Sequence, residues 1–315
     1  MAMDTIGRLI AQVDGERLRS RLFRLSSDPL PFRKANATLP GHSQSTLDEA
    51  DAFIAGCLAE AGYEVQWEPC RAQAFRCDVS KPPSQQYSPA ATEDPWYTLN
   101  NLYAERAGRS RPDEIVLLVA HKDSQSWNDS PGAYDNAVGT VALLEMATVL
   151  RSWHPERRLR LLFCNEEHTP WTSNVAAREA HARSDSIVAV LNTDSLGGKA
   201  DADAGRWTNV TQYSSPEGER IAELMAAVNR AFDLGLNQSA QFTEAPGDDH
   251  GVFFRHGFRA AVMNVGSLPY ADPNYHLLSD TPDRVDMDNV VAATRAVLAT
   301  ALVLALAAED DPAFA

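Results

Sequence analysis

The sequence predicts an α/β protein with three layers, in which a mostly parallel, mixed central sheet is covered by helices on both faces. Two observations lead to this fold class. Continuous apolar runs, which are typical of central strands buried on both faces, occur at 114–120, 158–165 and 186–194. These runs alternate with segments of helical periodicity, and strands that alternate with helices favour parallel pairing.

The N-terminal half is expected to supply two helices and two strands. Ser45 is a typical N-cap, and Asp48 stands where the acid of a capping box belongs. Prolines among polar residues indicate a surface loop. We therefore expect helices at 5–25 and 45–62, strands at 63–70 and 96–106, and a surface loop at 78–95.

The remainder of the chain alternates between strands and helices. We expect strands at 114–120, 158–165, 186–194 and 259–265, and helices at 137–153, 173–183, 216–232, 250–257 and 287–308. The last helix contains the longest apolar run, at 296–308, which is bounded by Arg295 and is too short to span a bilayer. It is expected to be a buried terminal helix.

The charge balance limits the possible partners. The 28 Lys and Arg residues face 43 Asp and Glu residues, giving a net charge of −15. So acidic a chain is poorly suited to bind nucleic acid or an anionic membrane surface. The first residues do not form a signal peptide, so we expect a cytoplasmic protein. Cys70 and Cys77 could pair across a hairpin, although reduced thiols are favoured in that compartment.

Potential metal ligands follow the predicted strands. In parallel sheets, ligands bind where the strands end. His121 and Asp123 follow the first apolar run, Glu166 and Glu167 the second, and Asp194 the third.

Two further segments carry side chains of the same kinds. Asp135 lies in the loop before the next helix, and Tyr270, Tyr275 and His276 follow the last strand. Carboxylates gathered beside a buried sheet repel one another and lose hydration, and a divalent cation removes that cost. The pattern therefore favours a metal site.

Five motifs occur in order: HKD, SPGAYDNAVG, NEEH, NTD, and YH followed by SDTPDRVD. Together they resemble the dizinc aminopeptidase family, which also contains glutaminyl cyclases and glutamate carboxypeptidases. The resemblance runs from about Pro40 to the final helix. It implies a zinc-exopeptidase (phosphorylase/hydrolase-like) fold with residues 1–315 in one catalytic domain. Residues 1–40 would be an N-terminal helix and connecting segment, with no inserted dimerisation or protease-associated domain.

The resemblance also implies a role for each matching residue. His121 and Asp194 would bind one zinc, Glu167 and His276 the other, and Asp135 both. Glu166 would be the general base, and Asp123 would orient His121.

Other residues have less defined roles. Asp249, in the motif GDDHGVFF, would lie behind the ligands or beside the substrate, or would cap the following helix. Tyr134 stands where the family commonly has Asp, and it could line the substrate pocket together with Tyr270 and Tyr275. His168 after the acid pair is another departure from the usual pattern.

The favoured function is a metallo-aminopeptidase that binds two Zn²⁺, with Co²⁺ or Mn²⁺ as possible substitutes, and acts on a peptide or aminoacyl substrate. One alternative is a transferase similar to glutaminyl cyclases that uses one zinc. A second alternative is a non-catalytic binding member of the family, against which the complete ligand set argues. Neither a nucleic acid nor a membrane is expected as a partner, and the sequence leaves the oligomeric state open.

Two structural predictions follow from the resemblance. The peptide bond between Asp135 and Asn136 should be cis. The side chains of His121, Asp135, Glu167, Asp194 and His276 should converge on two points roughly 3.5 Å apart. A trans bond would contradict the first prediction. A His276 far from Glu167 would contradict the assignment of the last ligand, and His250 would then be the next candidate.

Overall fold

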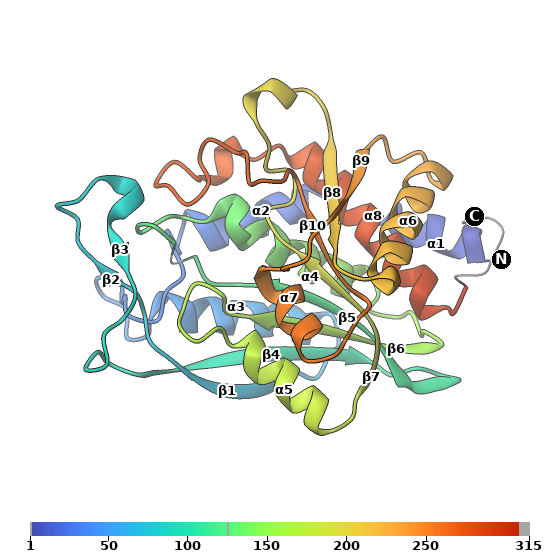
Figure 1. The fold of residues 1–315 in the computed structure, drawn as a ribbon, viewed down its shortest axis with the longest axis horizontal. Coiled ribbons are helices and arrows are strands. Elements are labelled where there is room, and N and C mark those ends of the chain that lie inside the picture. The colour runs from blue at the N-terminus through green and yellow to red at the C-terminus, as the bar shows by residue number, and fades with distance from the viewer. Residues whose placement is uncertain (1, 125, 309–315) are drawn as a thin grey trace.

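The computed structural model describes residues 2–124 and 126–308. An eight-stranded sheet runs through the middle of the protein (Figure 1). In spatial order its strands are β1 (Gln66–Ala72), β4 (Tyr97–Arg106), β6 (Arg157–Cys164), β5 (Arg111–His121), β7 (Ser186–Thr193), β10 (Ala261–Val265), β8 (Thr208–Tyr213) and β9 (Asn237–Phe242). A separate small hairpin joins β2 (Arg76–Cys77) and β3 (Tyr87–Ser88).

The sheet is mixed, as predicted, and its centre is parallel. β5 pairs in parallel with β6 and β7, β7 with β10, and β8 with β9, whereas β1–β4, β4–β6 and β8–β10 are antiparallel. His121 is in register with Cys164, and Asn264 with Thr193. The segments that leave β5, β6, β7 and β10 therefore emerge at the same edge of the sheet.

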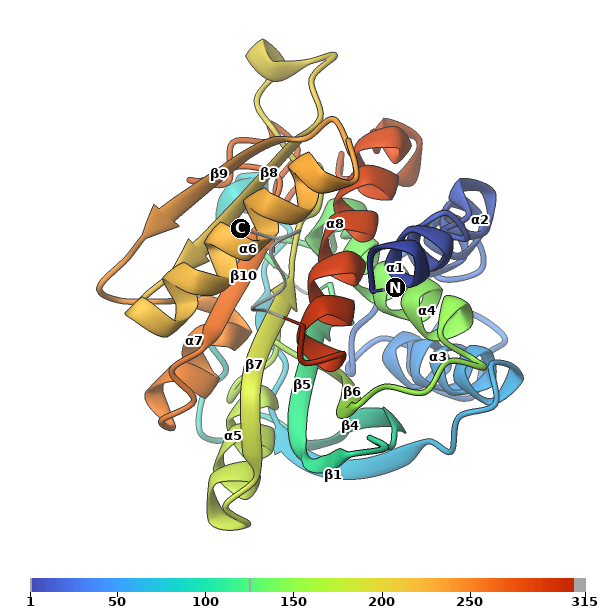
Figure 2. The ribbon, with the colours of Figure 1, turned by 90° about the vertical axis from the view of Figure 1, so that its right-hand side faces the viewer.

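Helices cover both faces of the sheet (Figure 2). One face is covered by α1 (Ala2–Ile10), α2 (Gly15–Ser26), α3 (Thr46–Glu60), α4 (Val138–Val149), α6 (Pro216–Ala231) and α8 (Met287–Ala305), which share one large apolar core. The other face is covered by α5 (Ser173–Ala182) and α7 (Asp248–Arg255), around a smaller core. The three-layer prediction is confirmed.

Helix α8 lies at the centre of the larger helical layer. It contacts α1, α4 and α6 as well as the central strands. By length and composition alone the whole 19-residue helix could span a membrane, because residues before the apolar run at 296–308 extend it. However, 78% of its apolar window is buried inside the protein, which confirms the predicted buried helix.

Three expectations about local structure need correction. The single helix predicted at 5–25 is two helices, because the Asp14 side chain accepts hydrogen bonds from the amides of Glu16 and Arg17 and starts α2 anew. The expected loop at 78–95 contains β3. Strands β8 and β9 were not predicted, because their sequences TNVTQY and NQSAQF are too polar to resemble buried strands. Cys70 and Cys77 are free thiols.

Candidate metal centre

The candidate ligands all lie at the edge where the parallel strands end. His121 is the last residue of β5, Asp194 follows β7, and Glu167 follows β6. Asp135 occupies the turn that precedes α4, and His276 lies in the loop after β10. The structure thus brings together five residues that come from five separate segments.

The five side chains form two groups that share Asp135. Its Oδ1 lies 3.0 Å from His121 Nε2, and Asp194 Oδ2 lies 3.7 Å from the same nitrogen. In the second group, Asp135 Oδ2 lies 2.6 Å from His276 Nε2, and Glu167 Oε1 lies 3.6 Å from the same nitrogen. Within each group of three, the potential ligand atoms all lie within 4.8 Å of one another. Asp135 therefore presents one oxygen to each group.

The environment of these groups fits a divalent cation. Both ring nitrogens of His276 are buried without a hydrogen bond to any described residue, although Nε2 is so close to Asp135. Burial raises the pKa of Glu167, and the neighbouring Asp135 raises it further. A cation held by Asp135, Glu167 and His276 would use the unpaired nitrogen and offset the repulsion between the two acids. Imidazole and carboxylate are donors that zinc accepts.

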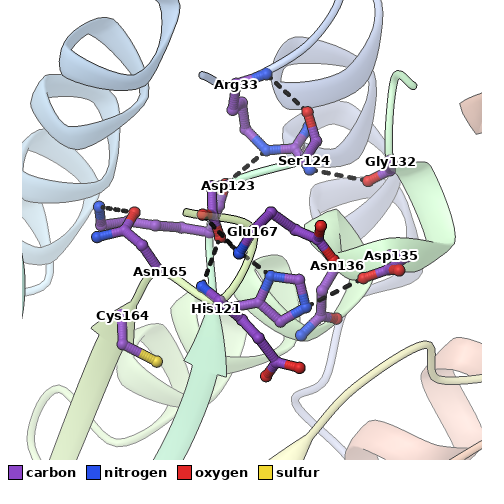
Figure 3. Close-up of polar contacts among 12 residues, drawn as sticks. Arg33, His121, Asp123, Ser124, Gly132, Asp135, Asn136, Cys164, Asn165 and Glu167 are labelled. Carbon is purple, nitrogen blue, oxygen red and sulfur yellow. Dashed lines mark hydrogen bonds and ion pairs between the residues drawn. The ribbon is translucent and has the colours of Figure 1, made fainter. Parts of the chain in front are cut away.

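Asp123 is the acceptor that organises this edge of the sheet. Its Oδ1 lies 3.2 Å from His121 Nδ1 and 3.0 Å from the amide nitrogen of Glu166 (Figure 3). Its Oδ2 accepts from the amide of Glu167 at 2.9 Å and lies 2.7 Å from His168 Nδ1. Burial alone would raise the pKa of Asp123, but the two histidines hold it far below its usual range. Asp123 thus leaves His121 Nε2 free to face the other ligands.

His168 was singled out in the sequence only as a departure from the usual motif. It is fully buried, and its Nε2 accepts a hydrogen bond from the amide of Ala35 at 3.1 Å. Because Nε2 is the acceptor, Nδ1 carries the proton and donates it to Asp123. His168 therefore joins the segment before α3 to the metal centre.

Hydrogen bonds to Asp280 and to the end of β7 hold the turn that carries Asp135. The bond between Asp135 and Asn136 is cis, as predicted. Asp280 accepts hydrogen bonds from the amides of Tyr134 at 2.8 Å and Asp135 at 3.2 Å. The Asn136 side chain donates to the carbonyl of Thr193 at the end of β7, at 2.8 Å. These contacts fix where the shared carboxylate stands relative to β7.

A buried arginine, Arg33, holds the loop before this turn. Its side chain is fully buried, and among the described residues it donates only to main-chain carbonyls, those of Lys122, Pro131, Gly132 and Leu25. Figure 3 shows the bond to Gly132. Glycine is needed at position 132 for this arrangement, because its φ is +57° and a Cβ there would lie 2.2 Å from the Asp135 carbonyl oxygen. Arg33 therefore clamps the backbone beside His121 to the backbone just before Asp135.

Arg33 also places a positive charge near the acids of the site. Burial lowers the pKa of Arg33 to about 10, while the charges of Asp123, Asp280 and Asp135 oppose that shift. An arginine with a pKa of about 10 is still cationic at neutral pH. Since its hydrogen bonds go to neutral carbonyls, its charge is available to offset these carboxylates together.

A third group of acids surrounds Glu166. Glu166, Asp194 and Asp248 lie together, and the hydroxyl of Tyr270 donates to Asp248 Oδ1 at 3.0 Å. Burial raises the pKa of Glu166, and Asp249 and Asp248 raise it further. Asp248, at the start of α7, was not singled out in the sequence. The sequence signal is the pair of acids in GDDHGVFF, but the direction of each side chain is set by α7.

Asp249 lies behind the site and does not line it. The residue is fully buried, and its Oδ2 is 3.0 Å from the sulfur of Cys164 at the end of β6. The N-cap of α7 is Gly247, and no side chain caps the helix. The capping role expected for Asp249 is therefore wrong, and its burial fits the expected position behind the ligands.

Aromatic rings pack around His276. Tyr275 stacks on its ring at 3.7 Å, and Tyr270 stacks on Tyr275 at 4.5 Å. Trp127, which the sequence analysis did not single out, meets His276 edge-on at 4.9 Å and is 41% exposed. Tyr134 borders a small cavity with both tyrosines, but its hydroxyl accepts from the amide of Asp286, away from the ligands. Trp127 is therefore an exposed aromatic residue in contact with a candidate ligand.

We expect Glu167→Gln to weaken metal binding, because an amide oxygen replaces a charged donor. Metal analysis after dialysis should show less metal per chain than in the unaltered protein. Glu60→Gln, on the exposed side of α3, is the matched control and should keep the full content. Equal metal content in both variants would remove Glu167 from the ligand set.

Arg33→Lys should lower metal affinity, because lysine keeps the charge but cannot reach several carbonyls at once. Partners that orient metal ligands typically contribute roughly 10–100-fold to affinity, and a loss of that order is expected. Competition with a chelator would measure it. Arg178→Lys on α5 is the surface control, and an unchanged affinity in Arg33→Lys would show that the clamp does not support the site.

Comparison with known proteins agrees with this geometry. The model of Peptidase family M28 matches residues 101–301. A probable aminopeptidase of Saccharomyces cerevisiae is 24% identical over 203 residues, which are 61% of this chain and 53% of that protein. An uncharacterised protein of Escherichia coli, YfbL, is 26% identical over 225 residues, covering 63% of this chain and 69% of that protein. The chain thus spans only about half of the first of these relatives.

Solved structures share the fold. A glutaminyl cyclase of Bacteroides thetaiotaomicron superposes with a TM-score of 0.69 at 18% identity, covering 92% of this chain and 97% of that one. An aminopeptidase of an Aneurinibacillus strain gives 0.68 at 15% identity, covering 95% and 96%. The donor set and the family match support zinc as the metal. The family model covers most of the described sheet and all five candidate ligands, so the chain belongs to Peptidase family M28.

Proposed function

We propose that the protein is a zinc-dependent aminopeptidase that removes the N-terminal residue of a peptide with the help of two zinc ions. The observation that carries this proposal is the pair of ligand groups that share Asp135, with Glu166 beside them but in neither. Such a site has separate places for metal binding and for proton transfer. His121 and Asp194 would hold one ion, and Glu167 and His276 the other.

Zinc bound there would polarise the scissile carbonyl and acidify the attacking water. The chain itself must move the proton. Glu166 Oε2 is buried and has no hydrogen-bond partner among the described residues, so it is available to accept a proton from water. The amide of Glu166 is held by Asp123, which keeps this carboxylate at the end of β6. Glu166 would then deliver the proton to the departing amine.

The surrounding charges suit this role and this substrate. Burial and the two aspartates on α7 raise the pKa of Glu166, and a base works best when its pKa approaches the working pH. Asp248, an acidic side chain outside the two proposed ligand groups, lies beside Glu166. A peptide's N-terminal ammonium is a group that such an acid favours, which supports cleavage at the N-terminus.

A glutaminyl-cyclase-like transferase is the second candidate. The observation that favours it is the close group of Glu166, Asp194 and Asp248, since an acid cluster could pass protons while ammonia leaves. That reaction would need only one zinc. The shared ligand Asp135, with one oxygen directed to each group, favours the two-metal hydrolase.

A substrate screen on protein of known zinc content distinguishes these functions. We expect two zinc ions per chain and release of free amino acids from aminoacyl substrates. Pyroglutamate formation from N-glutaminyl peptides by protein with one zinc would instead support the transferase. Absence of both activities in protein with two zinc ions would contradict the proposed hydrolysis of N-terminal peptide bonds.

Glu166→Gln should abolish proton transfer and leave metal binding intact. General acid–base catalysis is typically worth roughly 10²–10⁴-fold, so kcat should fall by at least this factor. The zinc content should stay that of the unaltered protein, because Glu166 is not proposed as a ligand. If the variant keeps normal turnover, Glu166 is not the base, and if it loses zinc, the roles of Glu166 and Glu167 are reversed.

A further inference from the structure

Trp127 exposes a large apolar ring beside a proposed metal ligand. Its ring centre lies 4.9 Å from that of His276 and 5.9 Å from that of Tyr275, and its plane is nearly perpendicular to both rings. Because Tyr275 and His276 stack on each other at 3.7 Å, the indole stands beside this stack and not on top of it. With 41% of the residue exposed, part of the indole is free to contact a molecule bound at the metal centre.

The loop that carries Trp127 is fixed by the β2–β3 hairpin, at the left of Figure 1. The carbonyl of Trp127 accepts a hydrogen bond from the amide of Tyr87 at 3.0 Å. The side chain of Asn128 donates to the carbonyl of Pro83, also at 3.0 Å. The backbone on which the indole is mounted is therefore held by a second segment, which favours a preformed contact surface.

The nearest acid in this loop is compensated. Asp129 forms an ion pair with Lys34 and accepts a hydrogen bond from the hydroxyl of Tyr87. A bound side chain that packs on Trp127 would therefore not face an unpaired charge from this loop. Such surroundings favour an apolar partner over a charged one.

A second exposed apolar residue belongs to the loop that carries His276. Leu278 is 54% exposed, and its neighbour Leu277 accepts a hydrogen bond from Ser130 Oγ at 2.9 Å. That bond joins the loop of His276 to the loop of Trp127. Two large apolar side chains are thus presented to solvent by two loops that are held together at the metal centre.

The two ends of the site indicate which part of a peptide reaches Trp127. Asp248, beside Glu166, is the acid proposed to attract the N-terminal ammonium. His276 belongs to the other ligand group, on the far oxygen of the shared Asp135. A peptide with its ammonium at Asp248 and its scissile carbonyl near Asp135 would continue past the scissile bond on the side of His276. Trp127 stands on that side.

We propose that Trp127 determines specificity for the second residue of the peptide, the one directly after the cleaved bond, and selects a large apolar side chain there. This inference rests on the proposed aminopeptidase function and adds the class of peptide that the site prefers. Burial of an apolar side chain against an aromatic ring, with the aromatic contact itself, is worth on the order of 10-fold in affinity. A contact that bound substrate and transition state share alters KM and leaves kcat nearly unchanged.

Release of leucine from three substrates with the same first residue tests the proposal: leucyl-glycine amide, leucyl-phenylalanine amide and leucyl-lysine amide. For the zinc-loaded protein, kcat/KM should be on the order of 10-fold higher with phenylalanine than with glycine in second place, through a lower KM. Trp127→Ala should bring this ratio close to one. Trp127→Phe, which retains an aromatic ring, should keep most of the preference.

Trp67→Ala is the matched control, because Trp67 is 48% exposed on the edge strand β1 and should not affect the ratio. The ratio of two kcat/KM values does not depend on the fraction of protein that holds zinc. A loss of metal through the contact with His276 therefore cannot imitate the expected change.

The outcomes separate this inference from the function on which it rests. A protein that releases leucine from all three substrates without preference would overturn the role of Trp127 and leave the aminopeptidase in place. So would an equal loss with glycine and phenylalanine in Trp127→Ala, since the ring would then only support His276. A preference for lysine would overturn the apolar class. Failure of the zinc-loaded protein to release leucine from any substrate would overturn both proposals.

Discussion

The metal centre depends on the hydrogen bonds that Asp123 accepts at the end of β5. This single carboxylate contacts His121, the amides of both Glu166 and Glu167, and His168. These hydrogen bonds fix His121 of β5 and the backbone of Glu166 and Glu167 after β6 relative to one another. Adjacent acids on a strand end can then serve different purposes, since the backbone is held while the two side chains diverge.

Support for the site also comes from a part of the chain outside the matched family region at 101–301. Arg33 clamps the backbone on both sides of the ligand cluster, and the amide of Ala35 fixes the tautomer of His168. Both contacts join the segment between α2 and α3 to the ends of the parallel strands. The N-terminal helices therefore belong to the architecture of the site and do more than cover the sheet.

The central strands and the candidate ligands could be predicted because each leaves a local signal in the sequence. Burial on both faces requires the continuous apolar runs of β5, β6 and β7, and the proposed ligands directly follow these runs or stand in short motifs. Strand β9 leaves no such signal, because an exposed edge strand can be polar. Arg33 could not be predicted either, since its partner Gly132 is 99 residues away and only the fold brings the two together. Asp248 was missed because its neighbour Asp249 carries the same side chain and differs only in the direction that α7 gives it.

The most direct test of this account is X-ray diffraction from zinc-loaded crystals, with anomalous data collected at the zinc absorption edge. Two peaks are expected about 3.5–4 Å apart, as in other two-metal sites. One should lie beside His121 and Asp194 and the other beside Glu167 and His276, with one oxygen of Asp135 on each. A single peak, or zinc bound away from Asp135, would contradict the shared-carboxylate site on which the proposed mechanism rests.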